Sequence, residues 1–175
     1  RWQRWFSTGF RGGIIATNTG PGTDSLFPSI ERVFTAANTP GLEIQPDFYQ
    51  FGAFAQVDYR DEPGNPRSGG NYVLAWNYFG DRNKSLYAFR RHEVELQQYI
   101  PFFNRRRVIA LRAKTSLTDT SRGRDVPFYM QQALGGSEDL RGFREFRFRD
   151  KNLVVYNLEY RWEVSAEGKP DAVIQ

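Results

Sequence analysis

Apolar and polar residues alternate along most of the chain. In the segment 152–164, the even positions from 154 onward carry only Val, Tyr, Leu and Trp, while the odd positions from 157 onward carry Asn, Glu and Arg. A period of two residues is that of a β-strand, whose successive side chains point to opposite faces of its sheet. Helical periodicity is nearly absent, so the pattern predicts an all-β fold. The expected strands are 1–16, 47–61, 70–80, 85–103, 106–119 and 152–164, with a strand stub at 171–175.

The connections between these strands differ strongly in length. Two are long, residues 17–46 and 120–151, with 30 and 32 residues. If neighbouring strands are antiparallel, successive connections fall at opposite ends of the sheet, and both long connections then lie at the same end. Long loops at one end and short turns at the other are typical of outer-membrane β-barrels. Within the first long loop, residues 28–37 predict a short surface helix.

Composition favours a membrane barrel over a soluble sheet. Aromatic residues make up 16% of the chain although hydrophobic residues reach only 39%, and the net charge is +4. The apolar strand faces are rich in Tyr and Trp, which prefer membrane–water interfaces, and the opposite faces carry charges of both signs, as a wet lumen would. The strands are near or above the roughly 9–11 residues that a tilted spanning strand needs. No run of 18 apolar residues exists, so a transmembrane helix is not expected.

The sequence therefore predicts a segment of a transmembrane antiparallel β-barrel, with about seven strands present. Seven strands cannot close a membrane barrel, which needs at least about eight, and unpaired strand edges in hydrocarbon are costly. The chain also begins and ends without a recognisable signal. We expect residues 1–175 to be a partial outer-membrane β-barrel domain whose flanking strands lie outside this sequence.

The second long loop carries the most specific motif. It contains Leu134-Gly135-Gly136, followed by Leu140-Arg141-Gly142-Phe143. These segments resemble the LGG…RGF signature of the BamA/TamA superfamily, the bacterial surface-antigen barrels. In that family the signature sits on a long extracellular loop that folds back into the lumen of a barrel of about 16 strands. The segment 157–161 resembles the family strand whose inward acidic residue, here Glu159, pairs with the arginine of the signature, here Arg141.

Physical chemistry supports the same residues as the candidate functional site. Glycine permits backbone angles that are closed to other residues, so the loop can turn tightly. The planar guanidinium of Arg141 suits a carboxylate, and Glu159 lies on the polar face of the next strand. Loss of one partner from a partly buried pair typically costs about 3–5 kcal/mol, so we expect this pair to pin the loop inside the barrel. The candidate residues are Gly135, Gly136, Arg141, Gly142, Phe143 (expected to pack at the loop tip) and Glu159.

The resemblance implies a location in the bacterial outer membrane and a role in inserting or translocating other polypeptides there. The implied partners are membrane lipid, client β-barrel or secreted polypeptides, and accessory assembly proteins. Neither enzymatic activity nor a cofactor is implied. The family's next strand carries a Phe-x-Asp-x-Gly-like element that this sequence does not reach, and POTRA domains, where present, would also lie outside it. The sequence thus leaves open whether the protein is an insertase, a TamA-like assembly factor or a two-partner secretion translocator.

Other function classes are less well supported. The chain has no cysteine and a single histidine, which excludes disulfides, thiolate metal sites and His₃ zinc sites. Residues 140–148 superficially resemble an RNA-recognition octapeptide, but no helical pattern flanks them and the net charge is small, so nucleic acid is not an expected partner. Glu93 and Glu95 are better explained as an inner-wall charge ladder facing Arg112 and Lys114 than as a catalytic pair. A passive porin-like or structural outer-membrane barrel and a soluble β-sandwich binding domain remain as alternatives.

Overall fold

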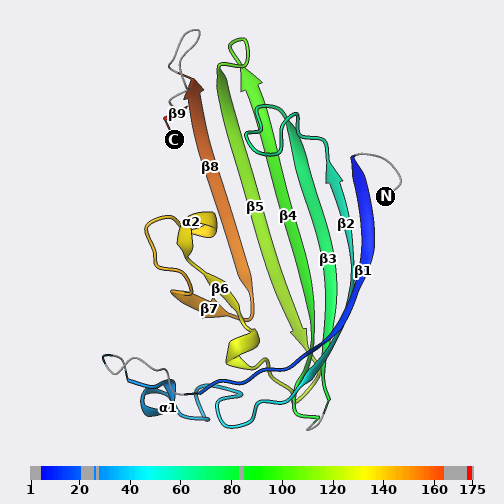
Figure 1. The fold of residues 1–175 in the computed structure, drawn as a ribbon, viewed down its shortest axis with the longest axis vertical. Helices are drawn as coiled ribbons and strands as arrows, with labels where there is room; N and C mark the ends of the chain where they lie inside the picture. Colours follow the sequence, from blue (N-terminus) through cyan, green and yellow to red (C-terminus); the bar gives the residue numbers. More distant parts are fainter. Residues whose placement is uncertain (1–4, 21–25, 27, 83–84, 164–172, 175) are drawn as a thin grey trace.

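The described residues form a seven-stranded antiparallel sheet with a long loop laid along it, and this loop carries a small two-stranded sheet of its own (Figure 1). The computed structural model describes residues 5–20, 26, 28–82, 85–163 and 173–174. The strand order follows the chain, β1-β2-β3-β4-β5-β8-β9, and every neighbouring pair is antiparallel. The strands are β1 (Phe6–Ile15), β2 (Phe48–Asp58), β3 (Gly69–Asp81), β4 (Ala88–Phe102), β5 (Arg107–Thr120), β8 (Leu153–Glu163) and β9 (Val173–Ile174). In the described residues the sheet does not close on itself, as expected for part of a barrel. The predicted fold, an all-β segment of an antiparallel β-barrel, is confirmed.

The predicted strands match the observed ones to within a few residues. The shifts among the described residues are largest at the end of β2, which is Asp58 rather than 61, and at the start of β4, which is Ala88 rather than 85. Residues 85–87 belong instead to a turn, in which the Asp81 N–H donates to the Tyr87 carbonyl (3.0 Å) and the Leu86 N–H to the Asp81 carboxylate (3.1 Å). The expected strand positions 1–4, 164, 171–172 and 175, and the expected turn 165–170, lie outside the described residues.

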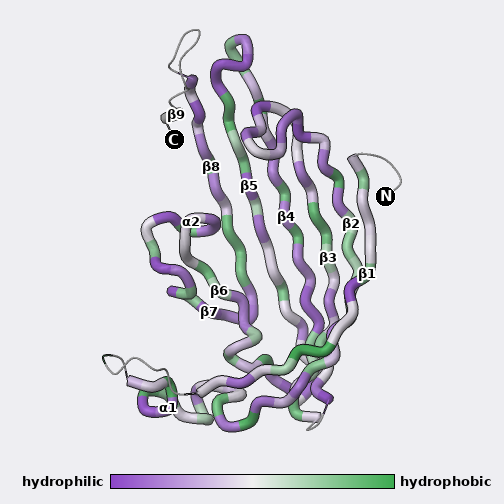
Figure 2. The backbone as a smooth tube through the Cα atoms, viewed as in Figure 1, coloured by the Kyte–Doolittle hydropathy of each residue, from purple (hydrophilic) through white to green (hydrophobic). Residues whose placement is uncertain are grey.

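The two faces of the sheet differ in chemistry. Strand register places Leu111 opposite Leu158 on one face and Arg112 opposite Asn157 on the other. Large apolar side chains stand exposed on the first face, including Leu158 at 73% and Tyr156 at 78% exposure. Figure 2 shows hydrophobic and hydrophilic residues alternating along the strands. No second sheet covers this apolar face in the described part of the chain, so the β-sandwich alternative is wrong. We call it the outer face and the opposite one the inner face.

Both long loops lie at one end of the sheet, the lower end in Figure 1, which we call the loop end. The β1–β2 loop contains α1 (Ile30–Val33), so the helix expected in 28–37 is reduced to a single turn. The β5–β8 loop contains η1 (Phe128–Met130), β6 (Gln132–Leu134), α2 (Gly136–Asp139) and β7 (Phe148–Asp150), with β6 paired to β7. Within the described ranges, none of the helices has the length and apolar character needed to cross a bilayer.

A small apolar core closes the inner face at the loop end. Phe48, Phe79 and Phe89 come from the adjacent ends of β2, β3 and β4, and Val126 comes from the β5–β8 loop; all four are buried. The rings of Phe79 and Phe89 stack with centroids 4.8 Å apart. The two long loops are joined beside this core, where the Phe128 N–H donates to the Pro40 carbonyl (2.8 Å). The β5–β8 loop is therefore rooted in packed residues before it runs along the inner face.

If the outer face contacts lipid, the cost of a charge should depend on the face that carries it. Leu74 and Val73 are neighbours in the middle of β3; Leu74 is exposed on the outer face, and Val73 lies opposite Glu95 on the inner face. We expect Leu74→Arg to lower the free energy of unfolding by about 2–4 kcal/mol, as for arginine near the bilayer midplane, and Val73→Arg to lower it much less. Urea unfolding of the full-length protein in phospholipid vesicles measures the free energy of unfolding of both variants. Equal destabilisation by the two variants would contradict a lipid-facing outer face.

Candidate functional site

The segment Leu140–Phe143 forms a tight turn in the β5–β8 loop. The Phe143 N–H donates to the Leu140 carbonyl at 3.3 Å, and the third residue of the turn, Gly142, has φ +93°. A turn with positive φ at its third residue requires glycine there, or at best asparagine. The arginine is thus presented at the second position of a turn that the following glycine makes possible.

The two halves of the motif pack backbone against backbone. The Gly136 N–H donates to the Phe143 carbonyl at 3.0 Å, so the Gly-Gly segment lies beside the turn. Gly135 and Gly136 have φ of +132° and +82°. A Cβ at Gly135 would overlap the carbonyl oxygen of Arg144, whereas a Cβ at Gly142 would meet nothing within 4 Å. Gly135 is therefore required by both space and conformation, and Gly142 by conformation alone.

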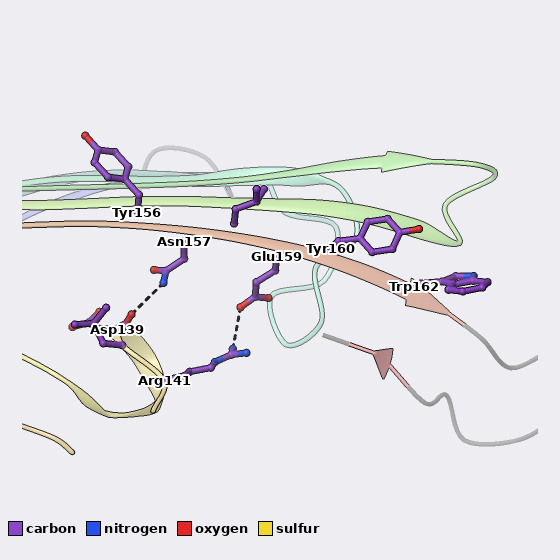
Figure 3. A pocket seen from close by; sticks show the side chains of 9 residues that line it. Asp139, Arg141, Tyr156, Asn157, Glu159, Tyr160 and Trp162 are labelled. Carbon is purple, nitrogen blue, oxygen red and sulfur yellow. Dashed lines mark hydrogen bonds and ion pairs between the residues drawn. The ribbon is translucent and has the colours of Figure 1, made fainter. Parts of the chain in front are cut away.

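Arg141 reaches from the loop to Glu159 on β8. Its Nη2 lies 3.0 Å from Glu159 Oε1, and Figure 3 shows the two side chains pointing toward each other below the strand. The other carboxylate oxygen of Glu159 lies 3.0 Å from Arg161 Nη2, so Glu159 is shared between two arginines. The Arg141 side chain is 58% exposed, and an exposed pair contributes about 0–1 kcal/mol. The expected cost of 3–5 kcal/mol is therefore too large, because it assumes a pair better screened from water.

Phe143 packs within the loop. Its ring centroid lies 5.3 Å from that of Phe148 on β7, in an edge-on arrangement, and its side chain is about half exposed. This contact joins the turn to the short β6–β7 sheet. The structure thus places all six candidate residues in one region. Five of them lie in the loop, and Glu159 lies on β8 of the large sheet, which we call the wall.

A residue outside the predicted set also contacts the large sheet, through both of its carboxylate oxygens. Asp139, the last residue of α2, has Oδ1 3.0 Å from Arg112 Nη1 and Oδ2 3.0 Å from Lys114 Nζ. Both cations lie on the inner face of β5. The Asp139 carbonyl also accepts a hydrogen bond from Asn157 Nδ2 at 3.1 Å (Figure 3). The available signal was the pair of inward cations, although sequence alone does not assign them an acidic partner in a distant loop.

The predicted charge ladder is present, although it is shorter than expected. Arg112 Nε lies 2.7 Å from Glu95 Oε1, and the strand register pairs Glu95 with Lys114. Glu93, in contrast, lies opposite Ser116 and accepts a hydrogen bond from Asn77 Nδ2 (3.0 Å). The ladder together with the loop forms a row of alternating charge, which runs from Glu95 through Arg112 and Asp139 to Lys114.

The β2–β3 turn crosses the inner face at the other end of the sheet. Arg67 Nη1 lies 2.7 Å from Glu163 Oε2 on β8, and Arg161 Nη1 donates to the Pro66 carbonyl at 3.4 Å. Since Arg161 also contacts Glu159, a chain of polar contacts links Arg141 to this turn.

The carboxylate of Asp61 organises that turn. It accepts the backbone N–H groups of Glu62, Arg67 and Ser68 at 2.9, 3.0 and 3.1 Å. Desolvation raises the pKa of Asp61, but these hydrogen bonds outweigh it and hold the pKa below the usual value for aspartate. The charged form that fixes the turn therefore persists at neutral and mildly acidic pH.

A polar cavity of about 520 Å³ lies between the loop and the wall, lined by charged side chains that include Glu95, Arg112 and Arg161. A second hollow of about 690 Å³ follows the edge of β8 (Figure 3). Within the described ranges, no group of three or more His, Cys, Asp or Glu side chains is placed to hold a metal ion. The arrangement is suited to holding a loop in place by charge and hydrogen bonding.

Comparison with known proteins gives a family and a fold. Residues 43–172 match the model of the Omp85 superfamily domain. The crystal structure of BamA from Haemophilus ducreyi lacking POTRA domains 1–3 is similar, with a TM-score of 0.59 and 18% identity over 71% of this chain. The chain spans 27% of the length of that BamA chain. A search of curated proteins gave no match.

The glycine geometry predicts different outcomes at two positions of the motif. Gly135→Ala should displace the loop, because the new Cβ collides with backbone, whereas Gly142→Ala should cost only the strain of a positive φ, about 1–2 kcal/mol. Trypsin added to intact cells should cleave the Gly135→Ala protein faster at Arg144 or Arg147. Equal cleavage of the two variants would contradict the backbone contact between the two halves of the motif.

Proposed function

Because the chain belongs to the Omp85 superfamily, we propose that it forms part of a barrel that inserts client β-barrels into the outer membrane or translocates secreted polypeptides across it. Members of this family are assembly and translocation proteins of the bacterial outer membrane. The chain spans about a quarter of the BamA chain. The activity, the clients and the accessory assembly proteins of the whole protein are therefore part of the proposal, as are POTRA domains.

One observation carries the proposal: the LGG…RGF loop is folded onto the inner face and fastened there. Its two halves are joined by a backbone hydrogen bond, and Arg141 and Asp139 contact the wall on two neighbouring strands. A loop held in this position occupies the lumen and supports the wall formed by β5 and β8. We propose that Arg141 and Glu159 help to hold it there, with Gly135, Gly136 and Gly142 shaping it and Phe143 packing it on β7.

The work on clients would involve no covalent step. A client strand entering hydrocarbon must pair its backbone groups, and the edge of an existing sheet offers the complementary groups. In an insertase, a barrel whose interior is occupied by its own loop would guide client strands along its wall rather than through an open pore. The need to pair strand edges in hydrocarbon applies to the barrel of every branch of the family, whether insertase, TamA-like factor or two-partner translocator.

The pairing of Arg141 with Glu159 is tested by reversing both charges in the full-length protein. Because Arg161 also contacts Glu159, every variant carries Arg161→Gln so that an arginine at position 159 faces no like charge. In this Arg161→Gln background, Arg141→Glu and Glu159→Arg should each lower client assembly several-fold relative to Arg161→Gln itself. Combining the two charge reversals should recover most of the lost assembly. The measurement is the amount of heat-modifiable, folded outer-membrane barrels in cells depleted of the wild-type protein. A double variant no better than either single one would contradict the pair.

The same experiment distinguishes a passive porin-like barrel. In that case client assembly would be unchanged in every variant, while uptake of small solutes would respond to the opening of the loop.

A further inference from the structure

We propose that Asp139 is the main positioning residue of the loop, and that it seats the loop on β5 so that Arg141 can reach Glu159. The relevance of this contact to client assembly rests on the proposed function. The contact itself, which we call the seat of the loop, is formed within this chain and can be tested without a client. Asp139 lies outside the LGG and RGF segments. It therefore adds a second, differently placed fastening to the loop.

The burial of the Asp139 and Arg141 ion pairs supports Asp139, rather than Arg141, as the main positioning residue. The Asp139 side chain is 11% exposed and its two cationic partners are 20% and 29% exposed, whereas the Arg141 side chain is 58% exposed. A charge pair screened from water is costly to break, while an exposed pair contributes little. Asp139 also engages both of its carboxylate oxygens with separate cations. The contact at Asp139 is therefore the stronger of the two.

The main chain is held at the same point. Arg112 Nη1 donates to the Glu138 carbonyl at 2.6 Å, and Asn157 Nδ2 donates to the Asp139 carbonyl. Arg112 and Asn157 are direct partners in the β5–β8 register, so the two donors stand side by side on the inner face. Two adjacent peptide carbonyls and one carboxylate are thus bound by one site on the wall. This fixes the position and direction of the chain immediately before the turn that carries Arg141.

Removal of Arg141 and removal of the Asp139 charge also leave different charges on the inner face. Without Arg141, Glu159 keeps Arg161 as its partner. Without the charge of Asp139, Arg112 and Lys114 remain together on one face of β5 with Glu95 as the acidic group in contact with Arg112. Removing Asp139 therefore leaves an excess of positive charge beneath the loop, whereas removing Arg141 leaves a satisfied pair.

The test measures how open the loop is, without reference to clients. The chain has no cysteine, so Ser116→Cys gives a reporter within it that a membrane-impermeant maleimide can label in intact cells. Ser116 follows Lys114 on the inner face of β5 and is 1% exposed, so it should be labelled slowly while the loop is in place. In the full-length protein we expect Asp139→Asn to raise the labelling rate about tenfold and Arg141→Gln to raise it about two- to threefold. Asp150→Asn, the same chemical change on the exposed strand β7 of this loop, is the matched control and should leave the rate unchanged.

A charge exchange provides the second arm. Asp139→Lys alone places three cations together and should open the loop or prevent accumulation of the barrel. Adding Lys114→Asp together with Glu95→Gln restores an opposite pair without placing two carboxylates opposite each other at 95 and 114, and this exchange should return both the folded protein and slow labelling. Faster labelling of Asp139→Asn with unchanged client assembly would support the seat while contradicting the proposed function. The proposal is overturned if Asp139→Asn labels no faster than Asp150→Asn, if Arg141→Gln opens the loop more, or if the exchange gives no recovery.

Discussion

A single layer of β-sheet here separates two solvents, and this constraint shapes the rest of the molecule. Backbone groups can be satisfied in hydrocarbon only by neighbouring strands, so the strands must be long, continuous and paired along their length. Side chains then alternate between lipid and lumen with a period of two residues. The same constraint explains why the polar chemistry of the chain gathers on one face, where Glu95, Arg112 and Lys114 find partners instead of bulk solvent.

The strands and their order were predictable from sequence because both follow from local information. Alternation sets the face of each residue, and the lengths of the connections set which ends of the strands meet. The loop motif was predictable by resemblance, and the turn at Leu140–Phe143 gives the physical reason for its glycine at position 142. The end of β4 near Ala88 was misplaced because a side chain, the Asp81 carboxylate, competes for a backbone N–H in the turn.

The seat of the loop was not predictable, because it depends on pairings between residues far apart in sequence. Asp139 meets cations 25 and 27 residues away, and Arg67 meets Glu163 across 96 residues. Several acidic residues of the loop are equally plausible partners on sequence alone. Exposure was also invisible: the expected strength of the Arg141–Glu159 pair assumed burial, whereas the structure leaves Arg141 mostly in solvent and lets Glu159 keep a second arginine.

The apolar core formed by Phe48, Phe79, Phe89 and Val126 gives the loop a property beyond packing. Because the chain is tethered there, a loop that leaves the wall stays close to it, at a high effective concentration, and rebinding is an intramolecular event. Individually weak contacts such as Arg141–Glu159 can then hold the loop for most of the time while still allowing brief release. The apolar core thus allows the loop to detach from the inner face and to rebind there. It also limits the detached loop to movements about the residues that stay packed in the core.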